Sequence, residues 1–256
     1  YRDATIEVQA VDVKTPVGLT VAYLPGVGDN SAPALQQLGL NVTVLDPSAI
    51  ASADFSRYRT VVVGPRFFEA HPELKHANVR LLEYARGGGT VVVQYGQEEM
   101  AQPGLMPFPV TYSRPADRVT VESAPVKVLD PSSPLLASPN RITSADFAGW
   151  IQDRTLYMPR TFDAHYAAPL ETHDPGEPEN AGALLVAPVG QGTYVYTTLA
   201  FFRQLPNGVP GAARLFVNLL SAKPAAAKKP AGVPVSLRPF PDSPSTGTRA
   251  GMRNEE

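Results

Sequence analysis

The sequence has no cysteine among its 256 residues, and only 18% of its residues are charged. The absence of cysteine excludes disulfide scaffolds, cysteine-ligated zinc and every thiol nucleophile. The formal net charge of -2 leaves no basic excess of the kind that nucleic-acid binding normally requires. The apolar runs are only a few residues long, so no segment is expected to span a bilayer. Association with a membrane complex stays open.

Proline, in contrast, is abundant: 27 residues, about twice its usual share. It is concentrated in an irregular stretch after Gly96 and in the C-terminal segment 224–256. This last segment has few large apolar residues, so it cannot bury enough surface to offset its ordering entropy. It is either a solvated linker or an extended segment that docks on a protein partner. In the second case the docking residues are Val233, Val235, Leu237, Arg238 and Phe240.

Buried-strand patterns alternate with helical patterns through the first hundred residues. Continuous apolar runs predict four strands, at 19–24, 41–45, 60–64 and 90–95. Apolar residues at helical spacing predict two helices, at 32–38 and 71–86. Strands of this continuous kind, separated by helices, predict an α/β domain with a mainly parallel sheet covered on both faces.

Further elements are predicted outside this alternation. They are strands at 5–13 and 118–128, a short helix at 144–147, a hairpin of 183–187 with 193–197, and a closing helix at 209–220. The domain division that follows is an N-terminal strand or linker over 1–18, the α/β domain over 19–222, and a proline-rich extended tail over 223–256. Because the first residue is Tyr1 and not Met, we expect a processed product or a piece of a longer protein.

The order of these elements resembles the class I glutamine amidotransferase-like fold, a flavodoxin-like three-layer sandwich. More narrowly, the chain is similar to the C-terminal domain of secreted PIG-L (LmbE-type) deacetylases, and more distantly to ThuA-type domains. The residues that carry the resemblance are 23–29, 34–39, 54–58, 80–84, 87–95, 173–178, 192–197 and 201–206. The resemblance implies an extracytoplasmic or periplasmic location. The deacetylase module itself, with its His/Asp metal motif, has no counterpart in this chain.

The nucleophile of active amidotransferases is a cysteine on a sharp turn after the central strand. The corresponding turn here is 94–97, which contains Gln94, Tyr95 and Gln97. A phenol has a pKa near 10, and an amide is not a nucleophile, so neither can replace a thiolate. We therefore expect no enzymatic activity, and expect Gln94 and Tyr95 to line a pocket mouth or complete an interface.

A ligand pocket could still survive at the carboxyl ends of the strands, where open α/β sheets bind ligands. The turn 25–29 resembles a phosphate loop, but it lacks the lysine of a P-loop and the third glycine of a dinucleotide fingerprint. A tight turn capped by Asp29 or Asn30 is the favoured interpretation. The predicted vestigial pocket is lined by Gly26, Gly28, Asp29, Gly64, Arg66, Gln94, Tyr95 and Gln97.

Other catalytic arrangements are weak. There is no Gly-x-Ser-x-Gly elbow. His71 and His76 are five residues apart, which does not place two ligands on one helix face. His173 and Asp174, with the nearby Glu177, lie in a turn rich in proline and glycine, where solvated acids are common. No metal site and no cofactor are predicted.

Three functions remain as hypotheses. The favoured one is a non-catalytic binding or structural subunit of a larger assembly, docked on protein partners by the tail and by exposed aromatic residues. The second is an accessory carbohydrate-binding domain of a PIG-L-type deacetylase. The third is a metal-dependent hydrolase that uses His173, Asp174 or Glu177. The aromatic residues considered are Phe67, Phe68, Trp150, Tyr157, Phe162, Tyr166, Phe201 and Phe202.

Overall fold

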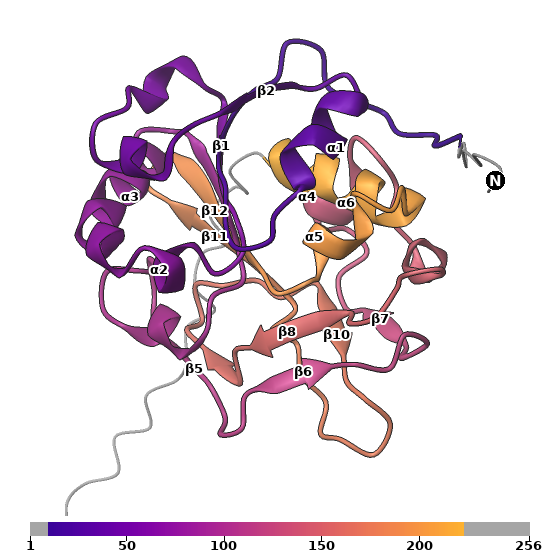
Figure 1. The fold of residues 1–256 in the computed structure, drawn as a ribbon. Helices are drawn as coiled ribbons and strands as arrows, with labels where there is room; N and C mark the ends of the chain where they lie inside the picture. The colour runs from indigo at the N-terminus through magenta and orange to yellow at the C-terminus, as the bar shows by residue number, and fades with distance from the viewer. Residues whose placement is uncertain (1–9, 223–256) are drawn as a thin grey trace, which may run out of the picture.

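A six-stranded sheet is the centre of the molecule in the computed structural model, which describes residues 10–222 (Figure 1). Its strand order is β11-β12-β4-β3-β1-β2. All neighbouring pairs are parallel except β11 and β12, which form an antiparallel hairpin. The strands are β1 (Thr20–Leu24), β2 (Asn41–Val44), β3 (Thr60–Val63), β4 (Thr90–Gln94), β11 (Leu184–Val189) and β12 (Gly192–Thr197). The predicted flavodoxin-like α/β sandwich is confirmed.

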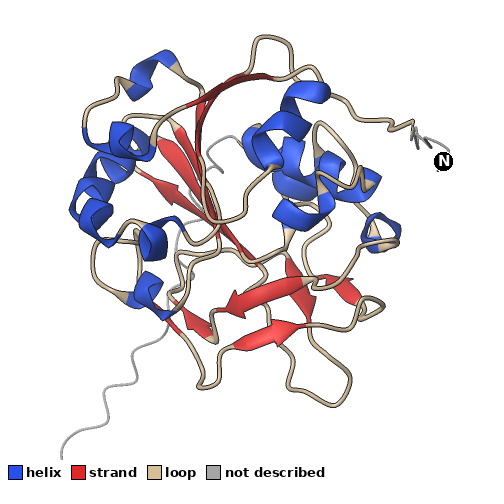
Figure 2. Ribbon diagram, in the orientation of Figure 1, coloured by secondary structure: helices blue, strands red, loops and turns tan. Residues whose placement is uncertain are grey.

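Alternate side chains of the central strands enter two separate cores, one on each face of the sheet. Along β3, Val62 belongs to one core and its neighbours Val61 and Val63 to the other. Successive residues of a strand point to opposite faces, so an uninterrupted valine run fills both cores. Figure 2 shows helices on both sides of the sheet. The first core is covered by α1 (Ser31–Gln37), α4 (Pro134–Ala137), α5 (Phe201–Gln204) and α6 (Pro210–Leu220), and the second by α2 (Phe67–Ala70) and α3 (Asn78–Arg86).

The single helix predicted over 71–86 is wrong in part. The structure has a 3₁₀ helix at Pro72–Ala77 that passes directly into α3. Pro72 has no N–H and begins a new helical segment. The side-chain amide of the buried Asn78 donates to the carbonyls of Gly104 and Leu105. These bonds anchor the chain where the 3₁₀ helix passes into α3.

The single strand predicted over 118–128 is also wrong. The structure contains two strands there, β6 (Asp117–Val119) and β7 (Val126–Val128), separated by a turn in which the Ala124 N–H donates to the Val121 carbonyl at 2.9 Å. The carboxylate of Asp174 accepts the backbone N–H groups of Thr120 and Val121, which draws the chain out of line after β6.

Short strands form a layer beside the main sheet, at the bottom of Figure 1. β6 pairs with β8 (Thr155–Met158), β7 with β10 (Leu170–Thr172), and β5 (Val110–Thr111) with β9 (Thr161–Phe162), each antiparallel. The phenol of Tyr112 lies 3.0 Å from that of Tyr196 on β12, so this layer packs against the main sheet. The sequence predicts an irregular stretch here because strands this short show no periodicity.

The N-terminal strand predicted over 5–13 is not formed within residues 10–13, and its first part lies outside the described residues. This segment is held instead by Lys14, whose backbone N–H and carbonyl both bond the side chain of the buried Asn140. The 3₁₀ helix Ser144–Phe147 confirms the short helix predicted there. Within residues 10–222, no helix is long and apolar enough to cross a membrane.

Candidate functional site

The carboxyl ends of β1 and β4 are joined by a buried hydrogen-bond network. The side-chain amide of Gln94 donates to the Tyr23 phenol at 2.7 Å, and this phenol donates to Asp29 Oδ2 at 2.8 Å. Asp29 also accepts the N–H groups of Gly26 and Ser31, at 3.3 and 3.0 Å. Burial, with a further contribution from the Asp29 charge, raises the pKa of Tyr23, which keeps the phenol neutral as a donor.

Two glycines allow the turns after β1 and β3 to touch. A Cβ on Gly64 would lie 2.3 Å from the Gly26 nitrogen and 2.4 Å from Asp29 Oδ2. A Cβ on Gly26 would lie 2.0 Å from the Pro65 carbonyl oxygen. The two turns are therefore in close contact. Asp29 accepts the N–H of Ser31 at the start of α1, as the capping interpretation predicts, whereas the side chain of Asn30 makes no cap hydrogen bond. Gly28 is exposed and serves the turn geometry, with φ +62°.

Tyr95, in the turn after β4, is the centre of an aromatic cluster. Its side chain is 5% exposed. The Tyr157 ring stacks on it at 6.1 Å between centroids with an interplanar angle of 10°, and Phe202 packs at 5.7 Å. The Arg203 guanidinium lies 4.8 Å from the centre of the Phe202 ring and pairs with Asp153 at 3.1 Å. We call these five residues the aromatic cluster.

Arg66 borders the aromatic cluster from the end of β3. Its backbone N–H donates to the Tyr95 carbonyl at 2.7 Å, so the turns after β3 and β4 are bonded to each other. Its guanidinium binds Glu69 through two nitrogens, and the Gln97 amide donates to the same carboxylate at 2.7 Å. The hydrogen bonds from Arg66 hold the pKa of Glu69 below its ordinary value. The predicted pocket residues Arg66 and Gln97 thus meet at Glu69, on the surface.

Left-handed backbone conformations concentrate around this site. Within residues 10–222, the non-glycine residues with positive φ are Arg66, Gln152 and Tyr157, at 56°, 58° and 53°. Such conformations cost of order 1 kcal/mol or more for a residue with a Cβ, and they persist where the surrounding structure imposes them. Tyr157 stacks on Tyr95, Arg66 bonds the Tyr95 backbone, and Gln152 precedes Asp153 of the cluster.

The chemistry available at Tyr95 is that of a neutral phenol. Burial raises its pKa to about 12, and the nearby Arg66 and Arg203 charges oppose this rise only in part. The sequence identified Tyr95 and Arg66 as neighbours, and it named Tyr157 and Phe202 as exposed aromatics. It did not connect them, and it missed Arg203 and Asp153. Their pairing depends on packing between α5 and the loop before β8, for which the sequence carries no local signal.

The residues of the hydrolase hypothesis do not converge. Asp174 is engaged by Thr120 and Val121, and the His173 ring nitrogen Nδ1 lies 2.7 Å from Glu171 instead. Of the histidines considered as a pair of metal ligands, His71 packs on the ring of Phe67 at 5.2 Å between ring centroids. Within the described residues, no group of three or more His, Cys, Asp or Glu side chains has the arrangement of a metal site.

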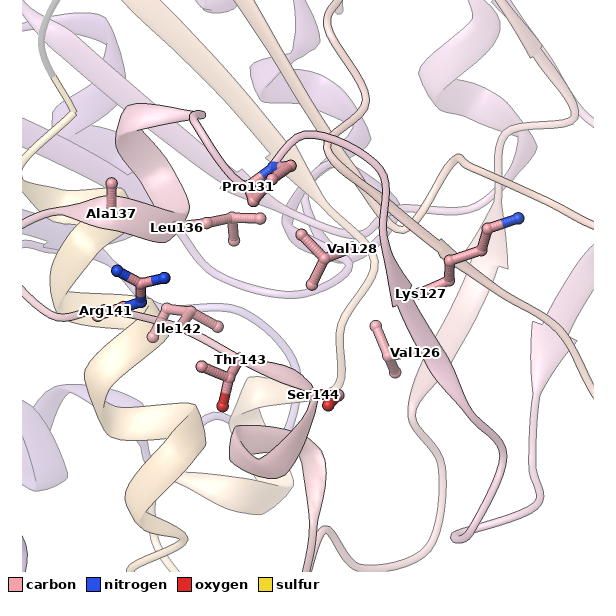
Figure 3. Close-up of a pocket in the computed structure, with 10 residues that line it drawn as sticks. All are labelled: Val126, Lys127, Val128, Pro131, Leu136, Ala137, Arg141, Ile142, Thr143 and Ser144. Atoms are coloured by element: carbon pink, nitrogen blue, oxygen red, sulfur yellow. The ribbon is translucent and has the colours of Figure 1, made fainter.

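Two cavities adjoin β7, and neither is lined by a residue of the aromatic cluster. The first has a volume of about 470 Å³ and separates β7 from the segment 136–144. Figure 3 shows Val126 and Val128 pointing into it toward Leu136 and Ile142, while Lys127 points away. The second, of about 550 Å³, adjoins the first, and Val126 and Ser144 line both.

Comparison with known proteins identifies the fold. Neither a family model nor a curated protein matches the sequence. A ThuA-like protein from Bacteroides uniformis is similar in structure, with a TM-score of 0.53 and 11% identity over 85% of this chain and 97% of that one. Two cytoplasmic proteins from Salmonella typhimurium have TM-scores of 0.52 and 0.50, at 15% and 12% identity. These matches cover 79% and 81% of this chain, and 98% and 100% of theirs.

One prediction is overturned by these neighbours. The extracytoplasmic location rested on the resemblance to secreted deacetylases, whereas two structural neighbours are described as cytoplasmic proteins. The fold is therefore not a mark of secreted proteins, and the predicted extracytoplasmic location is wrong as an inference from it. What the likeness establishes is the fold alone, which this chain shares with the ThuA-like protein and the two cytoplasmic proteins.

Proposed function

We propose that the chain is a non-catalytic binding module whose ligand lies on the aromatic cluster at the carboxyl end of the sheet. The observation that carries this proposal is the state of Tyr95: a buried, neutral phenol stacked on Tyr157 in the turn that the resemblance aligns with the amidotransferase nucleophile. Tyr157 and Phe202 are only half-buried, so their rings offer an apolar surface at the mouth of the site.

The charges around these rings support a neutral, polar ligand. The Arg203 guanidinium is compensated by Asp153, and that of Arg66 by Glu69. A compensated pair attracts no net charge, but it still presents fixed donors and acceptors to hydroxyl groups. This combination of stacking rings and bidentate groups favours carbohydrate binding as the second candidate function, including the role of an accessory domain in a PIG-L-type deacetylase.

Ligand titration tests the site. Calorimetry with a panel of neutral oligosaccharides is expected to find a binder whose affinity falls at least about tenfold in Tyr157→Ala, because one stacking surface is lost. Phe162→Ala, which removes a half-buried aromatic that makes no ring contact with the cluster, is the matched control and is expected to change the affinity less than about twofold. Equal losses in both variants would contradict the proposal.

The non-catalytic part has a separate test. The wild-type protein and Tyr95→Phe are expected to show no turnover of glutamine, esters or glycosides, because neither has an activated nucleophile. Turnover by the wild-type protein that Tyr95→Phe abolishes would show that the phenol is catalytic. The protein-docking role of the tail residues, Val233 to Phe240, lies outside the described residues and stays a prediction, to be checked by comparing partner capture by the full chain and by a chain ending at Ala222.

A further inference from the structure

Arg154 is a buried cation without an anionic partner. Three charged side chains are buried in the described part of the chain: Asp146, Arg154 and Glu171. Asp146 is paired with Arg214, and Glu171 with His173. Arg154 is 5% exposed, and within residues 10–222 it forms no ion pair. Burying an uncompensated charge is costly, so its retention requires an explanation.

The hydrogen bonds of Arg154 leave part of its guanidinium unused. Nη1 donates to the Phe147 carbonyl at 2.7 Å, whereas the buried Nε has no partner among the described residues. The backbone is fixed on both sides, because the Arg154 N–H donates to Val119 and its carbonyl accepts from Ala200. Desolvation lowers the pKa of Arg154, and the charge of Glu122 acts in the opposite direction. The side chain is therefore held in place with donors to spare.

Arg154 lines the second cavity, of about 550 Å³. Two walls are aromatic: Phe147 is 2% exposed and Trp150 3% exposed. The indole N–H of Trp150 is already used by the Asp146 carbonyl, so the ring presents an apolar face only. The cavity continues into the apolar one of Figure 3 through Val126 and Ser144, which line both.

One other charged group lines this cavity. Glu122 is exposed, and its Oε1 accepts the backbone N–H of Gln152. The negative charge of Glu122 repels a ligand in proportion to the ligand's own charge, so it disfavours a phosphate dianion more than a single carboxylate. Asp153, the neighbour of Arg154 in sequence, is already engaged by Arg203.

We propose that the second cavity binds a small organic acid, with its carboxylate on Arg154 and an apolar or aromatic body against Phe147 and Trp150. A carboxylate matches the fork of a guanidinium and gives charge-assisted hydrogen bonds that are stronger in a dry site. The apolar walls take the rest of the ligand, as in most small-molecule sites. None of the five residues of the aromatic cluster lines this cavity, so the two sites are tested with different variants.

The chain carries its own reporter for this site, because Trp150 is the only tryptophan in the sequence. Titration of the full-length protein with 3-phenylpropanoate, followed by tryptophan fluorescence, is expected to saturate. The uncharged analogue 3-phenylpropanamide is expected to bind at least about tenfold more weakly, because it lacks the charge that pairs with Arg154. A peptide with a free C-terminal phenylalanine tests whether the carboxylate instead belongs to a protein.

Three variants test the assignment. Arg154→Gln is expected to weaken 3-phenylpropanoate binding at least about tenfold, since it removes the charge-assisted bonds. Arg141→Gln, at an exposed cation of the adjoining cavity, is the matched control and should stay within about twofold. Glu122→Gln is expected to leave binding unchanged or to strengthen it up to about threefold, because it removes a like charge from the ligand's approach.

Several results would overturn the proposal. These are no saturable binding of 3-phenylpropanoate, equal binding of the amide, unchanged binding by Arg154→Gln, or binding of the peptide alone. If Arg154→Gln does not fold, Ala148→Phe takes its place, because Ala148 is exposed and lines the same cavity without bonding Arg154, and Trp150 stays the only tryptophan. It should abolish binding by filling the space, and unchanged binding in this variant would equally refute the site.

Discussion

The aromatic cluster and the Arg154 cavity both combine an arginine with aromatic rings, but only the arginine of the cluster is in an ion pair. In the cluster, Arg203 has Asp153 as its partner and Phe202 beneath it. In the cavity, Arg154 is more deeply buried and forms no ion pair with any residue that the structure describes. A compensated charge stabilises a surface and orients a neutral ligand, whereas an uncompensated one costs stability until an anion arrives. The two proposals therefore place a neutral ligand at the aromatic cluster and an organic acid in the Arg154 cavity.

The largest expected loss of stability comes from forcing apart the turns after β1 and β3, which border the aromatic cluster. Gly64→Ala places a Cβ against the Gly26 nitrogen and Asp29, where the backbone must move, and it is expected to cost about 2–4 kcal/mol in the free energy of unfolding. Gly28→Ala is the control. It meets no atom within 4 Å and pays only for its positive φ, about 1 kcal/mol. Urea unfolding measures both, and equal costs would contradict the close packing of the turns.

The next largest change in the free energy of unfolding is expected when the two arginines are replaced in turn. Arg203→Met leaves the carboxylate of Asp153 unpaired and is expected to cost about 1–2 kcal/mol, moderated by partial exposure of the pair. Arg154→Met loses one hydrogen bond but also removes an uncompensated buried charge, so we expect a net cost below about 1 kcal/mol. Thermal and urea unfolding check the order. A larger cost for Arg154→Met would mean that this guanidinium is structural.

The smallest expected effect is on how the free energy of unfolding depends on pH, through Asp174 beside the layer of short strands. Burial acts to raise the pKa of Asp174, but the hydrogen bonds from Thr120 and Val121 outweigh it, so the pKa lies below its ordinary value. Its stabilising contribution is therefore present above about pH 4, the range of an unfolded aspartate, and is lost as the pH falls through the lower folded pKa. Asp174→Asn should destabilise by less than about 1 kcal/mol at pH 7 and by a smaller amount near pH 2.

Glu177→Gln, at an exposed position of the same turn, controls for the general effect of removing a carboxylate. Its unfolding free energy should follow that of the wild-type protein at every pH. If Asp174→Asn showed the same constant difference at low and neutral pH, the carboxylate would not be the group that secures the break between β6 and β7.

The main sheet was predictable because its strands are rich in valine and other apolar residues and are separated by helical patterns and glycine stops. The run 60–63 fills both cores, and the turn after Val189 closes the β11–β12 hairpin as predicted. The layer of β5 to β10 was not predictable in the same way. Its strands have two to four residues each, which is too short for a period of two to be distinguished from chance.

The candidate site divides along the same line. Arg66 and Glu69 are three residues apart in one short helical turn, so their contact is local. The stacking of Tyr157 on Tyr95 joins the short-strand layer to the main sheet, and a left-handed backbone at Tyr157 holds it there. No local pattern predicts a tyrosine in that conformation, because it is imposed by the surrounding contacts.

The α/β order, the mainly parallel sheet and the absence of any thiol nucleophile could be read from the sequence alone. These follow from composition and from periodicities that each segment carries alone. The pairing of charges, in contrast, follows from packing: Arg203 meets Asp153, whereas Arg154 forms no ion pair within residues 10–222. The physical reason is that a salt bridge depends on the distance between atoms from separate segments, and that distance is fixed only when the segments pack.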